Sequence, residues 1–157
     1  MALERGDIMN NYEINSKTLA IIPMKNNISK VIEENNIFYI NKNPISIIDH
    51  SCKYFGSSYE GRHIGTVNMI GKSYKTPILI EETHNIIFFP TLSSKSKECY
   101  WISLNNIEKY KVDNINSTVI FKNGYKLNLN ISYGSLENQI LRSTLLDSIV
   151  RKHQKIS

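Results

Sequence analysis

Between Pro77 and Ile131 the apolar residues recur at every second position, with short polar clusters between the runs. A period of two is the period of a half-buried β-strand, because successive side chains point to opposite faces of the sheet. The pair Asn123-Gly124 separates two of these runs and predicts a hairpin turn of type I′, which needs positive φ at both central residues. We therefore expect a series of short antiparallel strands. Their residues are 77–81, 85–89, 99–104, 107–112, 117–121 and 125–131.

The chain before residue 43 divides into a polar start and further strand-like runs. Residues 1–11 predict a flexible N-terminus, followed by a single domain over residues 12–157. Strands are expected at residues 12–14, 18–23 and 30–40. The last run is expected to fold as a hairpin around Glu34-Asn35-Asn36, because asparagine tolerates turn geometry.

Two helices are expected between the two strand regions. Asn43-Pro44 supplies an N-cap residue followed by proline at the first helical position, and Gly56 suits the left-handed position that ends a helix. Ser57-Ser58 offers N-cap hydroxyls for a second helix over residues 59–70. Two glycines within that second helix each cost it about 1 kcal/mol relative to alanine.

A final helix is expected from Gly134-Ser135 to about His153. Its apolar residues form two stripes, whereas a surface helix needs only one, so the second stripe predicts contact with a neighbouring element or a second protomer. The stripes are Leu136, Ile140, Leu146 and Val150, and Leu141, Leu145 and Ile149. The predicted fold class is α+β, an antiparallel β-rich single domain with an internal helical segment at about 44–70 and a C-terminal helix at about 134–153.

Composition and motifs argue against several classes of function. The 157 residues are 41% hydrophobic, which suits one globular domain, and a formal charge of +5 allows an anionic partner. No Cys/His pair has zinc-ligand spacing, and neither a Gly-Lys-Ser/Thr phosphate loop nor a Gly-x-Ser-x-Gly elbow occurs. No apolar run reaches the length of a membrane span, and the start is too polar for a signal peptide. We expect a cytoplasmic protein with no membrane contact, metal, cofactor or enzymatic activity.

The most unusual stretch is residues 51–66, which combine three glycines, four Ser/Thr hydroxyls, two tyrosines and two cations. Hydroxyls and free N–H groups at a helix start bind phosphate oxygens. Over residues 53–75, lysine, arginine and histidine face a single acid, Glu60. The segment is therefore a candidate for contact with a nucleic-acid backbone. The alternative is a structural corner between two helices whose glycines permit close packing.

Other segments carry two interpretations each. The basic, hydroxyl-rich loop at residues 90–97 either follows a phosphate backbone or is an exposed connection, and Trp101 either stacks on a base or anchors the core. Cys52 lies on an apolar helix face, which favours an inert buried thiol over a nucleophile paired with His50 or His63. Side chains at the start of the last helix either reach base edges or cap the helix: Tyr133, Glu137, Asn138, Gln139 and Arg142. The candidate DNA-binding residues are Lys53, Ser57, Ser58, Arg62, His63, Lys72, Lys75, Lys95 and Lys97.

The segment Ser51–Arg62 strongly resembles the corresponding segment of the ComK family, the competence transcription factors of Gram-positive bacteria. Further blocks agree in order, so the similarity runs from about Tyr12 to Leu146. These blocks are Phe38-Tyr39-Ile40-Asn41 with Asp49, Phe89-Pro90-Thr91-Leu92-Ser93-Ser94, Trp101-Ile102-Ser103, Phe121 with Asn123-Gly124, and Ile131-Ser132-Tyr133 with Ser135, Glu137, Asn138, Gln139 and Arg142.

The resemblance implies a DNA-binding activator of DNA-uptake genes. Family members recognise paired A-tract and T-tract boxes, largely from the minor groove, and bind as dimers that assemble into a tetramer. We therefore expect the domain over residues 12–157 to bind double-stranded, AT-rich promoter DNA as a homodimer or tetramer. The resemblance also implies an adaptor and protease system acting on a C-terminal tail, whereas this sequence ends at Ser157. The alternative is a short paralogue that acts as a regulatory partner or decoy of a full-length activator through protein contacts.

Overall fold

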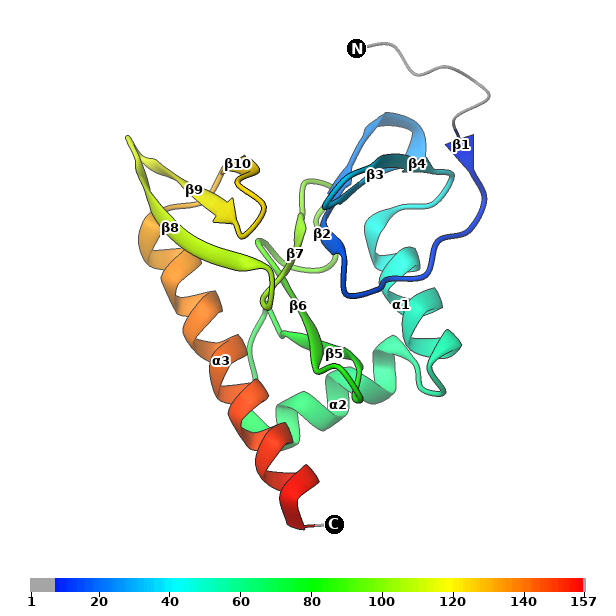
Figure 1. Cartoon of the computed structure of the whole chain (residues 1–157), viewed down its shortest axis with the longest axis vertical. Helices are drawn as coiled ribbons and strands as arrows, with labels where there is room; N and C mark the ends of the chain where they lie inside the picture. The colour runs from blue at the N-terminus through cyan, green and yellow to red at the C-terminus, as the bar shows by residue number, and fades with distance from the viewer. Residues whose placement is uncertain (1–7, 157) are drawn as a thin grey trace.

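The computed structural model describes residues 8–156, which form two β-sheets and three α-helices. The larger sheet has the strand order β1-β4-β3-β2-β7-β6-β5 and the smaller sheet the order β10-β9-β8 (Figure 1). Neighbouring strands are antiparallel except for β1 and β4. The strands are β1 (Ile8–Met9), β2 (Thr18–Pro23), β3 (Ser29–Glu33), β4 (Ile37–Ile40), β5 (Ile78–Glu81), β6 (Ile86–Pro90), β7 (Trp101–Ser103), β8 (Ile107–Asp113), β9 (Asn116–Phe121) and β10 (Lys126–Leu129). The helices are α1 (Pro44–Tyr54), α2 (Tyr59–Ile70) and α3 (Tyr133–Ile156).

These elements confirm the predicted α+β fold. The internal helical segment is α1 followed by α2, and the expected C-terminal helix is α3. The strand expected at residues 12–14 is wrong, because there the Ile14 amide donates to the Ser51 hydroxyl rather than to a strand ladder. The flexible N-terminus predicted for residues 1–11 falls mostly on residues 1–7, which lie outside the described residues. Within residues 8–11, the described part of this segment, strand β1 pairs with β4.

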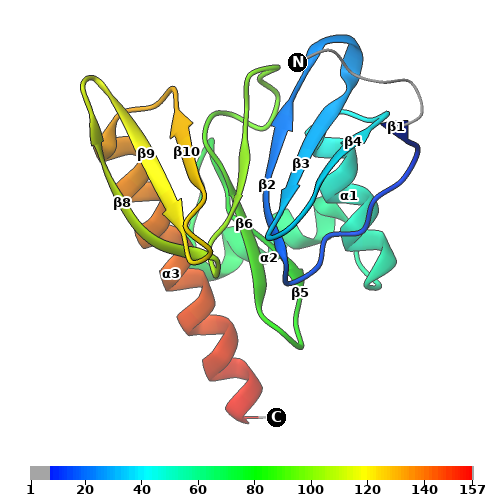
Figure 2. The same ribbon diagram turned by 45° about the horizontal axis from the view of Figure 1, so that its top comes forward.

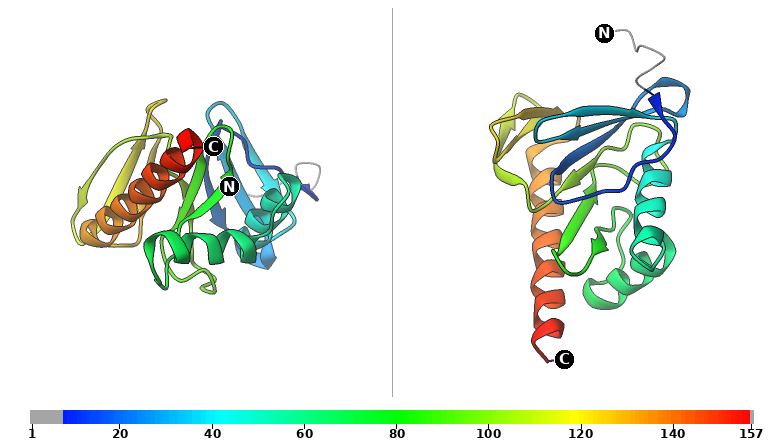
Figure 3. Two further views of the ribbon diagram at one scale, coloured as in Figure 1. Left: turned by 90° about the horizontal axis from the view of Figure 1, so that it is seen from below. Right: turned by 45° about the vertical axis from the view of Figure 1, so that its right-hand side comes forward.

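Alternate side chains of the larger sheet point to opposite faces, as the period of two requires. One face carries Ile21, Ile80, Phe88 and Trp101, which belong to the same buried cluster as Ile48 of α1. Helix α1 thus covers this face. Helix α2 contacts β5, α1 and α3, and lies between the two other helices (Figure 3).

The opposite face of the larger sheet packs against the smaller sheet and α3. Phe89 and Ile102 of the larger sheet share a buried cluster with Val119 and Phe121 of β9 and with Leu136 of α3. Further along, α3 packs on β5 and β6 through its last apolar turns. The larger sheet therefore lies between α1 on one side and the smaller sheet with α3 on the other (Figure 2).

The β9–β10 hairpin confirms the signal of Asn123-Gly124 but not the predicted turn type. Phe121 pairs with Tyr125, so three residues form the loop, and only Gly124 has a positive φ, of 91°. The Asn123 side-chain oxygen accepts from the Tyr125 amide at 3.1 Å. Such a loop needs left-handed backbone at one residue rather than two, and glycine supplies it without a steric penalty.

The corner between α1 and α2 has the caps that the sequence predicts. Gly56 has a φ of 90°, its amide donates to the Lys53 carbonyl at 3.1 Å, and the Ser57 amide donates to the Cys52 carbonyl at 2.9 Å. This pair of bonds is the Schellman motif, which satisfies the last carbonyls of a helix. The Ser58 hydroxyl then accepts from the Gly61 amide at 3.0 Å and begins α2. The chain therefore turns from α1 into α2 over a short connection, and both helices contact the edge strand β5.

Candidate nucleic-acid interface

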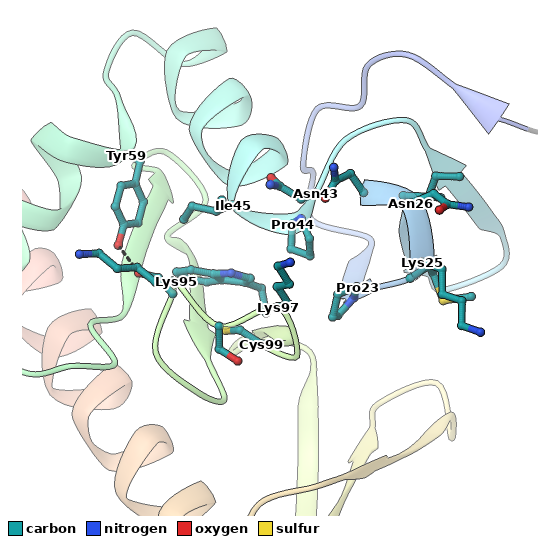
Figure 4. A pocket seen from close by; sticks show the side chains of 16 residues that line it. Pro23, Lys25, Asn26, Asn43, Pro44, Ile45, Tyr59, Lys95, Lys97 and Cys99 are labelled. Atoms are coloured by element: carbon teal, nitrogen blue, oxygen red, sulfur yellow. Dashed lines mark hydrogen bonds between the residues drawn. The ribbon is translucent and has the colours of Figure 1, made fainter.

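Two loops and the starts of two helices enclose a groove of about 1020 Å³ on the α1 side of the larger sheet. We call it the basic groove. Its rims are the β2–β3 loop, the β6–β7 loop and the starts of α1 and α2 (Figure 4). The buried residues Cys99 and Trp101 also line it. The lining residues are Pro23, Met24, Lys25, Asn26, Asn27, Ile28, Asn43, Pro44, Ile45, Tyr59, Ser94, Lys95, Ser96, Lys97, Cys99 and Trp101.

The charge of the basic groove is positive. Lys25, Lys95 and Lys97 line it, no carboxylate does, and none of the three lysines forms an ion pair within residues 8–156. Lys97 extends across the middle toward Pro44, whereas Lys25 points outward from the opposite rim (Figure 4). The N-terminus of α1 adds the positive end of a helix dipole, and its first turn contains no acid. The groove is thus suited to an anionic ligand.

Tyr59 fixes one wall of the basic groove. Its hydroxyl donates to the Ser94 hydroxyl at 3.2 Å, and its ring meets Trp101 edge-on with 6.4 Å between centroids. Its amide donates to an Asp49 carboxylate oxygen at 2.9 Å. The pKa of Asp49 is lowered, first by the hydrogen bond from Lys53 and then by this amide. Three of the segments that carry the sequence resemblance therefore meet in one wall.

The opposite rim depends on two residues with left-handed backbone. Asn26 and Asn27 have φ values of 63° and 57°, a conformation that asparagine adopts more readily than most residues. They reverse the chain between β2 and β3 and leave Lys25 at the exposed tip of the loop. Lys25 is not among the sequence-predicted contacts. The Asn26-Asn27 pair between two strand-like runs is the signal that would have placed a cation at a turn.

Of the nine predicted contacts, only Lys95 and Lys97 line the basic groove. Ser57 and Ser58 lie at the corner that precedes Tyr59, where the Ser58 hydroxyl already caps α2. Lys53 is exposed near the end of α1 and forms an ion pair with Asp49 at 2.8 Å. These corner residues are therefore neighbours of the groove wall rather than parts of its lining.

The other predicted cations lie elsewhere. The Arg62 side chain is only 17% exposed, and its guanidinium donates to Glu82 at 2.8 Å, so a carboxylate already offsets its charge. His63 and Lys72 line a separate hollow of about 680 Å³ along the exposed side of α2. Lys75 is half-buried in the connection between α2 and β5. The predicted cations thus lie at several separate places, with Lys95 and Lys97 in the basic groove and His63 and Lys72 in the hollow along α2.

Trp101 and Gln139 are buried, whereas Asn138 is exposed and Tyr133, Glu137 and Arg142 are partly exposed. Trp101 belongs to the core beneath α1. The buried Gln139 amide donates to the Lys75 and Pro90 carbonyls at 2.9 and 2.8 Å, and Arg142 donates to the Gly71 carbonyl at 3.2 Å. These bonds tie α3 to the adjacent segments. Base contact by Gln139 is therefore wrong as an interpretation, because its side chain has no exposed surface.

The Cys52 thiol is enclosed by the core cluster beneath α1. Burial raises the pKa of this thiol to about 12, because removal from water disfavours the thiolate. A thiolate nucleophile at Cys52 is therefore not accessible. Over residues 8–156, no group of three His, Cys, Asp or Glu side chains is arranged to hold a metal ion, and no helix is long and apolar enough to cross a membrane.

Comparison with known proteins gives a consistent result. The family model described as ComK protein matches residues 9–155. The competence transcription factor of Bacillus subtilis (strain 168) is 41% identical over 142 residues, which cover 88% of this chain and 74% of that protein. No solved structure matches the chain.

Proposed function

The chain belongs to the ComK family of competence transcription factors, and from this premise we propose that it binds A-tract and T-tract promoter boxes with its basic groove. The observation that carries the proposal is the set of three unpaired lysines, Lys25, Lys95 and Lys97, around a groove without a carboxylate. Ser94 and Ser96 alternate with Lys95 and Lys97 along the same loop, and their hydroxyls suit phosphate oxygens.

Recognition from the minor groove agrees with this chemistry. A-tracts have a narrow minor groove with enhanced negative potential, which attracts inserted cations. The minor groove distinguishes A·T from G·C and little else, so a few flexible lysines are enough to read such runs. The groove offers cations and hydroxyls on loops, without a helix positioned to enter a major groove by itself. It therefore fits shape and charge recognition better than a base-by-base code.

Base substitution tests the proposal. Inosine·cytosine pairs present the minor-groove pattern of A·T and the major-groove pattern of G·C, because inosine lacks the guanine amino group. In mobility-shift titrations, we expect the A-tract/T-tract duplex and its inosine·cytosine version to bind alike and the G·C version to bind much more weakly. Weak binding to both substituted duplexes would contradict minor-groove readout. Specific binding without activation of a promoter reporter would instead favour the decoy alternative.

We also propose that the outer stripe of α3 supports self-association. Leu141 and Leu145 lie one turn apart and are 60% and 49% exposed, whereas the inner stripe packs on the sheets. Replacing both leucines by glutamate is expected to give a folded monomer, because the charges meet water in the free chain and are buried in an oligomer. Sedimentation measures the oligomeric state of the variant, and circular dichroism measures whether it is folded.

A matched control is Tyr54→Glu, which adds a charge at an exposed apolar residue of α1. This control should leave the sedimentation behaviour unchanged. An oligomer that persists in the double leucine variant would place self-association on another surface. Unfolding of that variant would show instead that the outer stripe stabilises the monomer.

A further inference from the structure

The turn between β8 and β9 exposes an isoleucine that the fold does not use. Ile115 is 86% exposed, and Val112 beside it is also exposed. The hairpin projects from the body of the protein, with its turn at the free end (Figure 1). Asp113 pairs with Asn116, so Asn114 and Ile115 are the two loop residues. An apolar side chain at this position gains no burial within the monomer.

Turn chemistry does not explain Ile115 either. Asn114 takes left-handed backbone, with a φ of 56°, as asparagine often does. The second loop residue of a tight hairpin is commonly glycine, asparagine or another small polar residue, since these fit the turn and are well hydrated. A β-branched apolar residue there departs from the local rule, and such departures concentrate at functional sites.

The sheet behind the turn carries cations on its outer face. Lys109 of β8 and Lys126 of β10 both lie opposite Ile120 of β9, and Lys111 lies opposite Thr118. This face points away from the cluster that contains Val119. None of the three lysines forms an ion pair in the described part of the chain. The three lysines project from strands of one small sheet whose neighbours lie about 4.8 Å apart, so their like charges share one face.

The hairpin also contains two acids, which limit what it can bind. Glu108 lies in the irregular part of β8 beside Lys109, and Asp113 begins the turn. Both are exposed, and neither has an ion-pair partner among the residues that the structure places. The hairpin is therefore no general anion site. Its distinctive feature is an apolar tip with cations set back along the strands.

We propose that the tip of the β8–β9 hairpin enters the DNA minor groove and that Ile115 contacts the base steps as an apolar wedge, an inference that rests on the proposed function. Proteins that bend DNA from the minor groove insert isoleucine, leucine, phenylalanine, methionine or proline between base steps. The minor groove is only about 6 Å wide, so it admits the turn but not both strands. Lys109 and Lys111 then face the phosphates on the groove edge, and the Asn114 amide lies beside the A·T acceptors.

The test is the variant Ile115→Ala in titrations and circular-permutation electrophoresis with an A-tract/T-tract duplex. We expect about tenfold weaker binding, because the apolar contact is lost, and a smaller DNA bend. The dependence of binding on salt should be unchanged, because no charge is removed. Thermal unfolding tests separately whether Ile115 stabilises the fold. Because this side chain is exposed, Ile115→Ala should leave the melting temperature almost unchanged.

The matched control is Ile37→Ala at the start of β4, directly after the turn of the β3–β4 hairpin. Ile37 is 45% exposed but follows Glu33 and Glu34 instead of lysines, so it should not approach DNA. Equal binding and equal bending by wild type and Ile115→Ala would overturn the wedge while leaving the proposed function intact. Failure of the wild-type protein to prefer the A-tract/T-tract duplex over the G·C duplex would overturn both.

Discussion

Replacing Lys25, Lys95 and Lys97 together by alanine is expected to weaken binding to an A-tract/T-tract duplex by roughly 500-fold at about 0.1 M salt. Each lysine that neutralises one phosphate contributes about 0.9 to the slope of log K against log salt, so three contribute about 2.7. These contributions vanish at about 1 M salt. At a tenfold lower salt concentration, a slope of about 2.7 corresponds to a change of about 2.7 decades in the binding constant. Titrations at four or five salt concentrations measure the slope and the affinity together.

Net charge alone also affects binding, and a control removes this ambiguity. The variant with Lys17, Lys152 and Lys155 replaced by alanine has the same loss of three charges, from a formal +5 to +2, at exposed residues outside the groove. Its affinity for DNA should fall only because the net positive charge of the protein is smaller. The slope of log K against log salt should remain close to that of the wild type. If the two triple variants behave alike, the basic groove is not the DNA contact. Circular dichroism should show native folding for both variants.

Much of the fold could be predicted because local patterns and tertiary packing agree. The period of two after Pro77 corresponds to strands whose alternate side chains enter different buried clusters. Gly56 and Ser58 predicted the two helix ends correctly, since caps depend on residues within one turn. Residues 12–14 could not be predicted in the same way. Their apolar side chains resemble a strand, but the backbone partner is the Ser51 hydroxyl, 37 residues away.

The candidate site was less predictable, because it depends on which loops meet. In the sequence, about 70 residues lie between the β2–β3 loop and the β6–β7 loop. Only the strand order of the sheet brings both loops to the start of α1. Arg62 has the composition of a DNA contact, yet Glu82 lies beside it in space. Charge counted along a segment therefore overestimates the charge that a ligand meets. Lys25 shows the converse, since an isolated cation becomes part of a positive rim.

Gln139 illustrates the same limit, and its replacement provides a second large prediction. In the sequence it stands with Asn138 and Arg142, residue types that read base edges. In the structure its amide is fully buried and donates to two carbonyls, at Lys75 and at Pro90. Those carbonyls come from the segments before β5 and at the end of β6. This side chain therefore links α3 to the end of β6 and to the segment before β5, beside the apolar contacts of the helix.

The variant Gln139→Leu is expected to lower the free energy of unfolding by about 2–4 kcal/mol, because the buried Pro90 carbonyl and the partly buried Lys75 carbonyl lose a donor while side-chain volume is nearly kept. Asn138→Leu, at the exposed neighbouring residue, should change it by no more than about 0.5 kcal/mol. Chemical denaturation measures both. Under conditions where the Gln139 variant remains folded, its preference for A·T over G·C duplexes should equal that of the wild type. Normal stability with relaxed sequence preference would contradict this structural role and return Gln139 to the DNA interface.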